Sequence, residues 1–213
     1  MKKLFVPVAV MMFLIFSFGM ANANLIVNGS FEDPVIGGPV SQFGEDEVTG
    51  WNSDEKLELQ SSSLFGPAAD GDQYLELDAL TGNDNPWVTQ TFNTEVGQEY
   101  TFRFAFSPRP GVEDNILEVG IWSPAGDHWL VHDNSIAASG VEFYETDWKY
   151  YTYTFIADAD YARVSFRDAG ADDSVGTLVD DVSVFSAPEP ATMLLLSMGL
   201  IGLAGFGRKK FKK

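Results

Sequence analysis

The chain has 213 residues, with 31 acidic and 13 basic side chains, a formal net charge of −18 at pH 7 and no cysteine. A negative charge of this size repels nucleic acid and anionic membrane surfaces, which excludes functions that depend on holding either one. The absence of cysteine excludes a small fold held together by disulfides.

The first 23 residues have the pattern of a secretory signal peptide. Lys2 and Lys3 form a basic start, an apolar run continues to Met20, and Ala21-Asn22-Ala23 is a small-x-small cleavage site. This pattern predicts export and cleavage before Asn24. An uncleaved membrane anchor is the alternative, and the well-placed cleavage site disfavours it.

Residues 24–187 are the predicted working part of the protein, and their number suits a single domain. They hold 30 of the 31 acidic side chains but only 6 of the 13 basic ones, so their formal charge is 6 minus 30, or −24. Such a surface attracts divalent cations, because a bound cation relieves the repulsion between carboxylates.

Alternating apolar residues in this segment predict strands separated by turns. The clearest run places Tyr100, Phe102, Phe104 and Phe106 on one face of a strand, where aromatic side chains build a core. A long polar loop is predicted over residues 30–50, and no stretch has the period of an amphipathic helix. In chain order, the predicted strands cover residues 24–27, 56–60, 73–78, 87–92, 99–107, 116–122, 129–132, 148–156, 161–167 and 178–185.

Many short strands joined by turns favour an all-β fold, an antiparallel β-sandwich, over an α/β fold. A jelly roll is the most specific prediction, because it places the first strand of the domain beside the last.

The last 26 residues contain three parts in a fixed order. Pro188-Glu189-Pro190 breaks any regular structure, residues 191–207 are uncharged and mostly apolar, and residues 208–213 carry five basic side chains. The apolar part is just long enough for a transmembrane helix, and the basic end would stay in the cytoplasm. A plain membrane anchor is the simpler alternative.

This tail resembles the PEP-CTERM sorting signal of Gram-negative bacteria. The resemblance implies that an exosortase-type membrane protease cuts near Pro188–Pro190. It further implies that the exported protein is anchored in the membrane for a time and then reaches the cell surface or is secreted. Such proteins are associated with bacteria that make extracellular polysaccharide and biofilm.

The middle segment carries a second set of motifs. It begins Asn24-Leu-Ile-Val-Asn-Gly-Ser-Phe-Glu32, and it ends Leu178-Val-Asp-Asp-Val-Ser-Val184. Between these lie Ala68-Ala-Asp-Gly-Asp-Gln-Tyr-Leu-Glu-Leu77 and Val96-Gly-Gln-Glu-Tyr-Thr-Phe-Arg-Phe104. In this order the motifs resemble the galactose-binding-like jelly rolls, which include several families of carbohydrate-binding modules. They are also similar to PEP-CTERM-type surface proteins with an N-G-x-F-E opening.

That second resemblance implies a structural Ca²⁺ that ties the first strand to the last. Carried over by position, the ligands would be Glu32, an oxygen from the Asp70-Gly71-Asp72 turn, and one of Asp180 or Asp181. Hard carboxylate oxygens suit calcium well. Strand parity leaves the choice between the two aspartates open. The alternative is that all these residues are ordinary loop and turn charges.

Catalytic signatures are scarce in the segment. His128 and His132 could bind zinc with Asp127 or Asp133, as in a metal-dependent hydrolase, but no H-E-x-x-H motif accompanies them. No nucleophile elbow, phosphate loop or dinucleotide fingerprint is present. We therefore expect a protein that is not an enzyme, with a hydrolase as the third-ranked alternative.

Carbohydrate binding is the favoured hypothesis, because sugar-binding modules stack pyranose rings on exposed tryptophans. Trp51 and Trp148 occupy positions typical of packing residues. Trp122 and Trp129, which flank the turn from Pro124 to Asp127, are the predicted ligand-binding pair. The second-ranked alternative is a structural envelope or biofilm protein with a calcium-stabilised domain and no sugar ligand.

Overall fold

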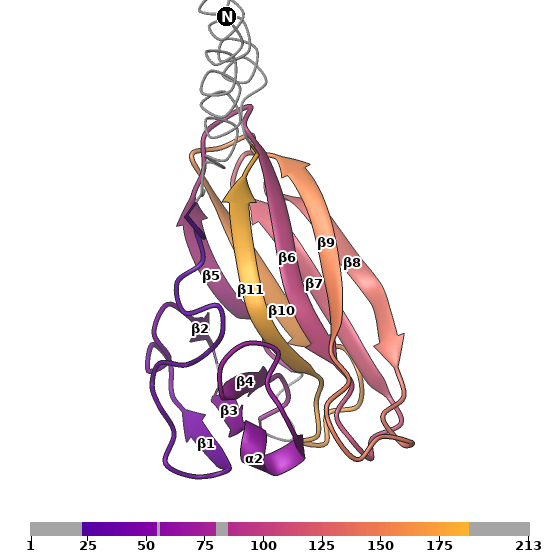
Figure 1. Ribbon diagram of the computed structural model, residues 1–213. Coiled ribbons are helices and arrows are strands. Elements are labelled where there is room, and N and C mark those ends of the chain that lie inside the picture. Colours follow the sequence, from indigo (N-terminus) through magenta and orange to yellow (C-terminus); the bar gives the residue numbers. More distant parts are fainter. Residues whose placement is uncertain (1–22, 55, 80–84, 188–213) are drawn as a thin grey trace, which may run out of the picture. The chain divides into compact units, whose positions relative to one another are not determined.

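Alternating apolar side chains build two antiparallel sheets that pack face to face (Figure 1). The computed structural model describes residues 23–54, 56–79 and 85–187. The six-stranded sheet has the order β1-β3-β4-β11-β6-β9, and the five-stranded sheet has the order β2-β5-β10-β7-β8. The strands are β1 Val40–Phe43, β2 Asn52–Ser53, β3 Leu57–Ser61, β4 Gln73–Glu76, β5 Val88–Asn93, β6 Glu99–Ser107, β7 Asn115–Ser123, β8 His128–Ala138, β9 Lys149–Ile156, β10 Tyr161–Asp168 and β11 Leu178–Ser186.

The core lies between the inner faces of the two sheets and is rich in aromatic residues. Phe104 of β6 meets Phe166 of β10 edge to face, with ring centroids 5.2 Å apart, and both side chains are fully buried. Trp51 stacks on Phe31 at 5.0 Å and also contacts Phe166. These contacts confirm the predicted aromatic face of β6 and the predicted all-β sandwich.

The amino-terminal segment of the domain lies beside its last strand, as a jelly roll requires. The Leu25 amide donates to the Val184 carbonyl at 2.9 Å, and the Val182 amide donates to the Gly29 carbonyl at 2.9 Å. The predicted strand over residues 24–27 is nevertheless wrong. Hydrogen bonds of the Asn24 side chain take the place of part of a backbone ladder with β11. This side chain accepts from the Val184 amide and donates to the Val182 carbonyl.

β1 and β2 were not predicted and β8 is longer than predicted, and all three strands lie at sheet edges. β1 falls within the predicted loop over residues 30–50 and pairs with β3 alone. β8 continues to Ala138, beyond the predicted end at His132, through the polar run Asp133-Asn134-Ser135. An edge strand keeps much of its surface in water, so its sequence lacks the apolar alternation of central strands. A single helical turn, α2 (Ser62–Phe65), also interrupts a predicted loop.

The predicted signal peptide, residues 1–23, lies almost wholly outside the described residues. The Pro-Glu-Pro motif, the predicted transmembrane helix 191–207 and the basic tail 208–213 lie entirely outside them. Within the described ranges, no helix has the length and apolar character needed to cross a membrane.

Candidate functional site

The outer face of the five-stranded sheet carries a row of large side chains from three strands. Arg163 on β10 pairs in register with Trp122 on β7, and Trp122 pairs with Trp129 on β8. Neighbouring residues such as Val164 and Ile121 point into the core and are fully buried. Because side chains alternate along a strand, Arg163 and Trp122 point to the outer face and stay half-buried there. The two predicted tryptophans therefore do lie together.

The ring of Trp129 lies close against the backbone of β7. A Cβ atom added at Gly120 would come within 2.6 Å of Cε3 of this ring. Any larger residue at position 120 would collide with this ring and, also at 2.6 Å, with the Val131 carbonyl oxygen. Gly120 is therefore required for Trp129 to cover the outer face.

Further side chains line up with Trp129 across the same face. Trp87 approaches it with ring centroids 5.4 Å apart, and the His132 ring stacks on it at 5.0 Å with an interplanar angle of 11°. At the other end, the guanidinium carbon of Arg167 lies 4.9 Å from the centroid of the Trp87 ring. The four side chains form a continuous aromatic and cationic row.

The carboxylate of Glu118 forms hydrogen bonds with the residues at both ends of this row, His132 and Arg167. Its Oε1 atom lies 2.6 Å from Nε2 of His132, and its Oε2 atom accepts from Nε of Arg167 at 2.6 Å. Desolvation of the Glu118 carboxyl tends to raise its pKa, but the hydrogen bonds from His132 and Arg167 outweigh it and hold the pKa below the usual range. Glu118 is thus an ionised anchor that orients both partners, and through them the tryptophan rings.

Trp122 is held separately. The guanidinium carbon of Arg163 lies 4.5 Å from its ring centroid, and its Nε1 atom donates to Oδ1 of Asp127 at 2.8 Å. Since the guanidinium covers one face of the indole, only the opposite face can meet a ligand. We call the set Trp87, Glu118, Trp122, Trp129, His132, Arg163 and Arg167 the outer-face cluster.

From the sequence, Trp87 was one of five candidate tryptophans but was not chosen, and Glu118 and the two arginines of this cluster were not considered. A usable signal was present, because Arg163 and Arg167 lie four residues apart on one predicted strand and so share a face. The contact between Trp87, which precedes β5, and Trp129 on β8 leaves no local pattern, because β5 and β8 are not neighbours in the sheet.

Trp51 and Trp148 have packing roles, as expected. Trp51 is buried and its Nε1 atom donates to the Asn28 carbonyl at 2.9 Å. Trp148 donates to the Pro67 carbonyl at 2.7 Å and meets Tyr74 edge to face.

The two histidines have different carboxylate partners. His128 lies 3.2 Å from Oδ2 of Asp158, whereas His132 pairs with Glu118. Asp133, considered as a third zinc ligand, accepts from the Tyr153 hydroxyl instead. Among the described residues, no group of three or more His, Cys, Asp or Glu side chains is placed to hold a metal ion. The structure therefore gives the zinc hypothesis no support.

The predicted calcium ligands Glu32 and Asp180 reach the same turn, residues 69–73, from opposite ends of the domain. Oε1 of Glu32 accepts from the amides of Asp72 and the following residue, each at 2.7 Å. Oδ2 of Asp180 accepts from the amide of Asp70 at 3.0 Å and from the preceding amide at 2.8 Å. Both carboxylates thus bind backbone N–H groups of one turn.

Asp180 and Asp181 point in different directions. Asp180 is fully buried against the turn, together with Val182 and Val184 on the inner side. Asp181 has a φ of +45° at a break in the ladder between β11 and β6, and its Oδ2 atom lies 3.4 Å from Nη1 of Arg103. Of the two aspartates left open by the sequence, only Asp180 faces the predicted metal position.

This arrangement fits a calcium ion in part. Burial raises the pKa of Asp180 to about 8, so a nearby cation would offset the cost of ionising it. Since no metal-binding group of side chains occurs in the described chain, Glu32 and Asp180 would supply only some of the roughly six to eight oxygens that calcium needs. Backbone carbonyls would have to supply others. Calcium binding stays a prediction.

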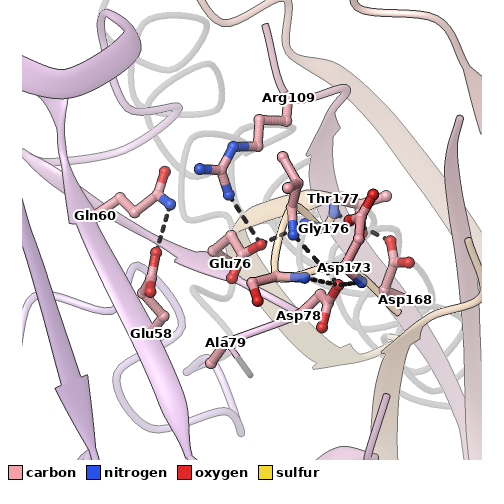
Figure 2. A network of polar contacts seen from close by, with 12 residues as sticks. Glu58, Gln60, Glu76, Asp78, Ala79, Arg109, Asp168, Asp173, Gly176 and Thr177 are labelled. Carbon is pink, nitrogen blue, oxygen red and sulfur yellow. Dashed lines mark hydrogen bonds and ion pairs between the residues drawn. The ribbon is translucent and has the colours of Figure 1, made fainter. Parts of the chain in front are cut away.

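A second group of carboxylates is buried where β4 approaches the segment that leads into β11 (Figure 2). Oε1 of Glu76 accepts from Nη1 of Arg109 at 3.1 Å and from the Gly176 amide. Oδ2 of Asp78 accepts from three consecutive backbone amides, residues 173–175, at 2.9, 2.7 and 3.2 Å. Oδ1 of Asp168 accepts from the amide of Thr177 at 3.1 Å (Figure 2). These carboxylates hold the 173–177 segment in place.

Burial perturbs two carboxyl groups of this network strongly. Desolvation raises the pKa of Glu76 to about 8 and that of Asp168 to about 6. Together with Asp180, these groups take up protons when the protein folds near neutral pH. Their contribution to stability is therefore present at mildly acidic pH and is lost as the pH rises towards 8.

Family models identify both parts of the chain. Residues 24–185 match DUF642, a protein family of unknown function, and residues 186–209 match the PEP-CTERM protein-sorting motif. The first match covers most of the chain, so the protein belongs to the DUF642 family. The second confirms the resemblance of the tail to a PEP-CTERM signal. No curated protein matches the chain.

Several solved structures have a similar fold. The Stig cyclase Fisc from Fischerella sp. TAU, in complex with (3Z)-3-(1-methyl-2-pyrrolidinylidene)-3H-indole, matches with a TM-score of 0.59 and 16% identity, over 79% of this chain and 99% of that chain. A CBM4 structure matches with a TM-score of 0.44 and 16% identity, over 76% and 99% of the two chains. The K2 cleaved adhesin domain of Lys-gingipain gives 0.43 and 17%, over 80% and 100%. At such identities only the fold of the cyclase is informative, and it is consistent with the observed β-sandwich.

The raised carboxyl pKa values predict a pH-dependent stability. The melting temperature should fall by about 5 °C or more between pH 5 and pH 8, because the folded state must release protons from buried carboxyl groups. Glu76→Gln keeps an acceptor for Gly176 but cannot ionise, so its melting temperature should depend less on pH. Calorimetry at several pH values measures this, with Glu113→Gln at an exposed position as the control. An equal pH dependence in both variants would contradict the assignment to Glu76.

The calcium hypothesis predicts that added Ca²⁺ raises the melting temperature and that a chelator reverses the rise. Asp180→Asn should abolish this shift, since Asp180 alone of the two aspartates faces the turn. Asp181→Asn is the matched control and should retain the shift. A wild-type melting temperature that does not change with calcium or chelator would contradict the calcium hypothesis.

Proposed function

We propose that the protein is exported, processed by an exosortase-type protease, and displayed at the cell surface or in the extracellular matrix, where its sandwich binds polysaccharide. The sorting motif supports export and this location outside the cell. In this proposal, residues 191–207 anchor the chain until cleavage near Pro188–Pro190, and the domain of residues 24–187 is then released or attached outside the cell.

The observation that carries the binding function is the outer-face cluster. Trp122 and Trp129 lie in one row on a sheet face, where the indoles can offer an apolar surface to the C–H face of a pyranose ring. Arg163 and His132 stand beside them as donors for sugar hydroxyls. Because Glu118 fixes His132 and Arg167, the row is held in place before a ligand arrives, which lowers the entropy lost on binding.

The same contacts favour binding over catalysis. His132 and Glu118 are bonded to each other on this face, and His128 is paired with Asp158 at the end of the strand. Among the described residues these pairs form no metal-binding group. A metal-dependent hydrolase therefore ranks last among the candidates.

A structural role is the second candidate, and a specific observation favours it. Glu32 and Asp180 join the two ends of the domain through one turn, which would make a stiff module for an envelope or biofilm. Such a protein would need no sugar ligand.

Polysaccharide binding predicts that Trp122→Ala and Trp129→Ala each weaken binding by about tenfold or more, because each removes stacking surface. The measurement is retention of the full-length protein, in mild detergent, on a glycan array and on exopolysaccharide from the producing cells. Tyr144→Ala is the control, since Tyr144 is 95% exposed and lies outside the cluster. Lack of retention of the wild type on every glycan would favour the structural candidate.

Sorting predicts that the extracellular form begins at Asn24 and ends near Pro188–Pro190. Mass spectrometry of the intact extracellular protein measures both ends. Replacing Pro188, Glu189 and Pro190 by alanine should leave a protein of residues 24–213 in the membrane fraction, whereas Pro39→Ala should be processed normally. An extracellular wild-type protein that retains residues 191–213 would contradict the processing step.

A further inference from the structure

Cationic groups are rare in the domain, and two of its four arginines lie together on one strand. Residues 24–187 contain six Lys and Arg side chains against 30 carboxylates. Arg163 and Arg167 both lie on the outer face of β10, and both histidines of the chain lie on β8, two strands away. The only carboxylate within the outer-face cluster is Glu118, and it is bonded to His132 and Arg167. Within the cluster, two guanidinium groups therefore accompany a single carboxylate.

Arg163 differs from the other arginines in having no carboxylate partner. Arg103 pairs with Asp181, Arg109 with Glu76 and Arg167 with Glu118, at distances of 3.4, 3.1 and 2.5 Å. Within the described chain, Arg163 forms no ion pair, and its buried Nε atom has no acceptor. An unpaired guanidinium in a domain with so many carboxylates has a large unused capacity for an anion.

Because Arg163 lies beside two indoles, the anion that suits it best is one attached to a sugar ring, which can stack on a tryptophan. Its guanidinium packs on the indole of Trp122, which stands beside Trp129 in the same row. At the edge of the cluster, the carboxylate of Asp127 accepts a hydrogen bond from Nε1 of Trp122. A planar guanidinium binds a carboxylate with two parallel hydrogen bonds, and an adjacent indole binds the apolar face of a sugar.

We propose, building on the proposed polysaccharide binding, that the preferred ligand is an acidic polysaccharide whose uronic acid residues place their carboxylate on Arg163 while the sugar ring stacks on the adjacent indole of Trp129. The charge of the rest of the domain does not prevent this contact. At physiological ionic strength repulsion between exposed charges is screened beyond about 8 Å, so the local guanidinium decides the interaction.

The test compares one polymer with and without its carboxylates. Full-length protein in mild detergent is titrated against polygalacturonate, alginate and hyaluronate, and against the same polymers after chemical reduction of each carboxylate to a primary alcohol. We expect at least one acidic polymer to bind about tenfold or more tightly than its reduced form, which is the worth of a charge-assisted hydrogen-bonded pair.

Arg163→Gln should bring the two forms of that polymer to within about twofold of each other, while Arg163→Lys should keep part of the preference. Arg103→Gln is the matched control, because Arg103 also packs on an aromatic ring, Tyr150 at 3.8 Å, but on the other sheet. It should keep the full preference. The melting temperature of each variant shows whether it folds.

Three outcomes separate this inference from the proposed function. If the wild type binds acidic and reduced polymers equally, or if Arg163→Gln keeps the preference, the uronate assignment is wrong and polysaccharide binding stands. If the wild type binds the reduced polymers more tightly than the acidic ones, the ligand is a neutral glycan and the uronate assignment is wrong. If it binds none of these polymers nor any glycan on the array, both proposals fall.

Discussion

The contact between Phe104 of β6 and Phe166 of β10, 5.2 Å between ring centroids, joins the inner faces of the two sheets. Burial of such rings is the main gain in free energy when the sandwich forms. It also determines the other face of β10. Because Val164 and Phe166 must point inward, Arg163 and Arg167 must point outward, where they meet Trp122 and Trp87. The position of the outer-face cluster is thus a consequence of core packing.

The domain has too few cations to neutralise its carboxylates, and backbone amides take over part of that role. Asp78 accepts from three amides and Asp180 from three, one of them its neighbour Asp181. Amide groups satisfy hydrogen bonding but carry no net charge, so burial still raises the pKa of Asp180. Glu118 is the opposite case, since His132 and Arg167 lower its pKa. A carboxylate that holds a loop through backbone amides, such as Asp180, thus has a raised pKa, whereas Glu118, which orients the outer-face cluster, has a lowered pKa.

The fold class was predictable because it depends on a pattern that repeats along the chain. Alternation over residues 99–107 gave both the strand and its inward face, and Tyr100, Phe102, Phe104 and Phe106 are buried as expected. Edge elements were not predictable to the same degree. β1 and the end of β8 are half-exposed, and the segment 24–27 bonds through the Asn24 side chain, so hydrophobic period carries little information there.

By itself, the sequence determined the sandwich, the sorting motif at its end, and two of the three tryptophans of the outer-face cluster, because local periodicity and contiguous motifs encode these features. Only the tertiary structure decided which partners each of these residues meets. Trp87 reaches Trp129, Glu118 bridges His132 and Arg167, and Asp180 rather than Asp181 faces the turn near Glu32. These contacts join residues far apart in the chain, and they depend on strand register and on a break in the ladder of β11.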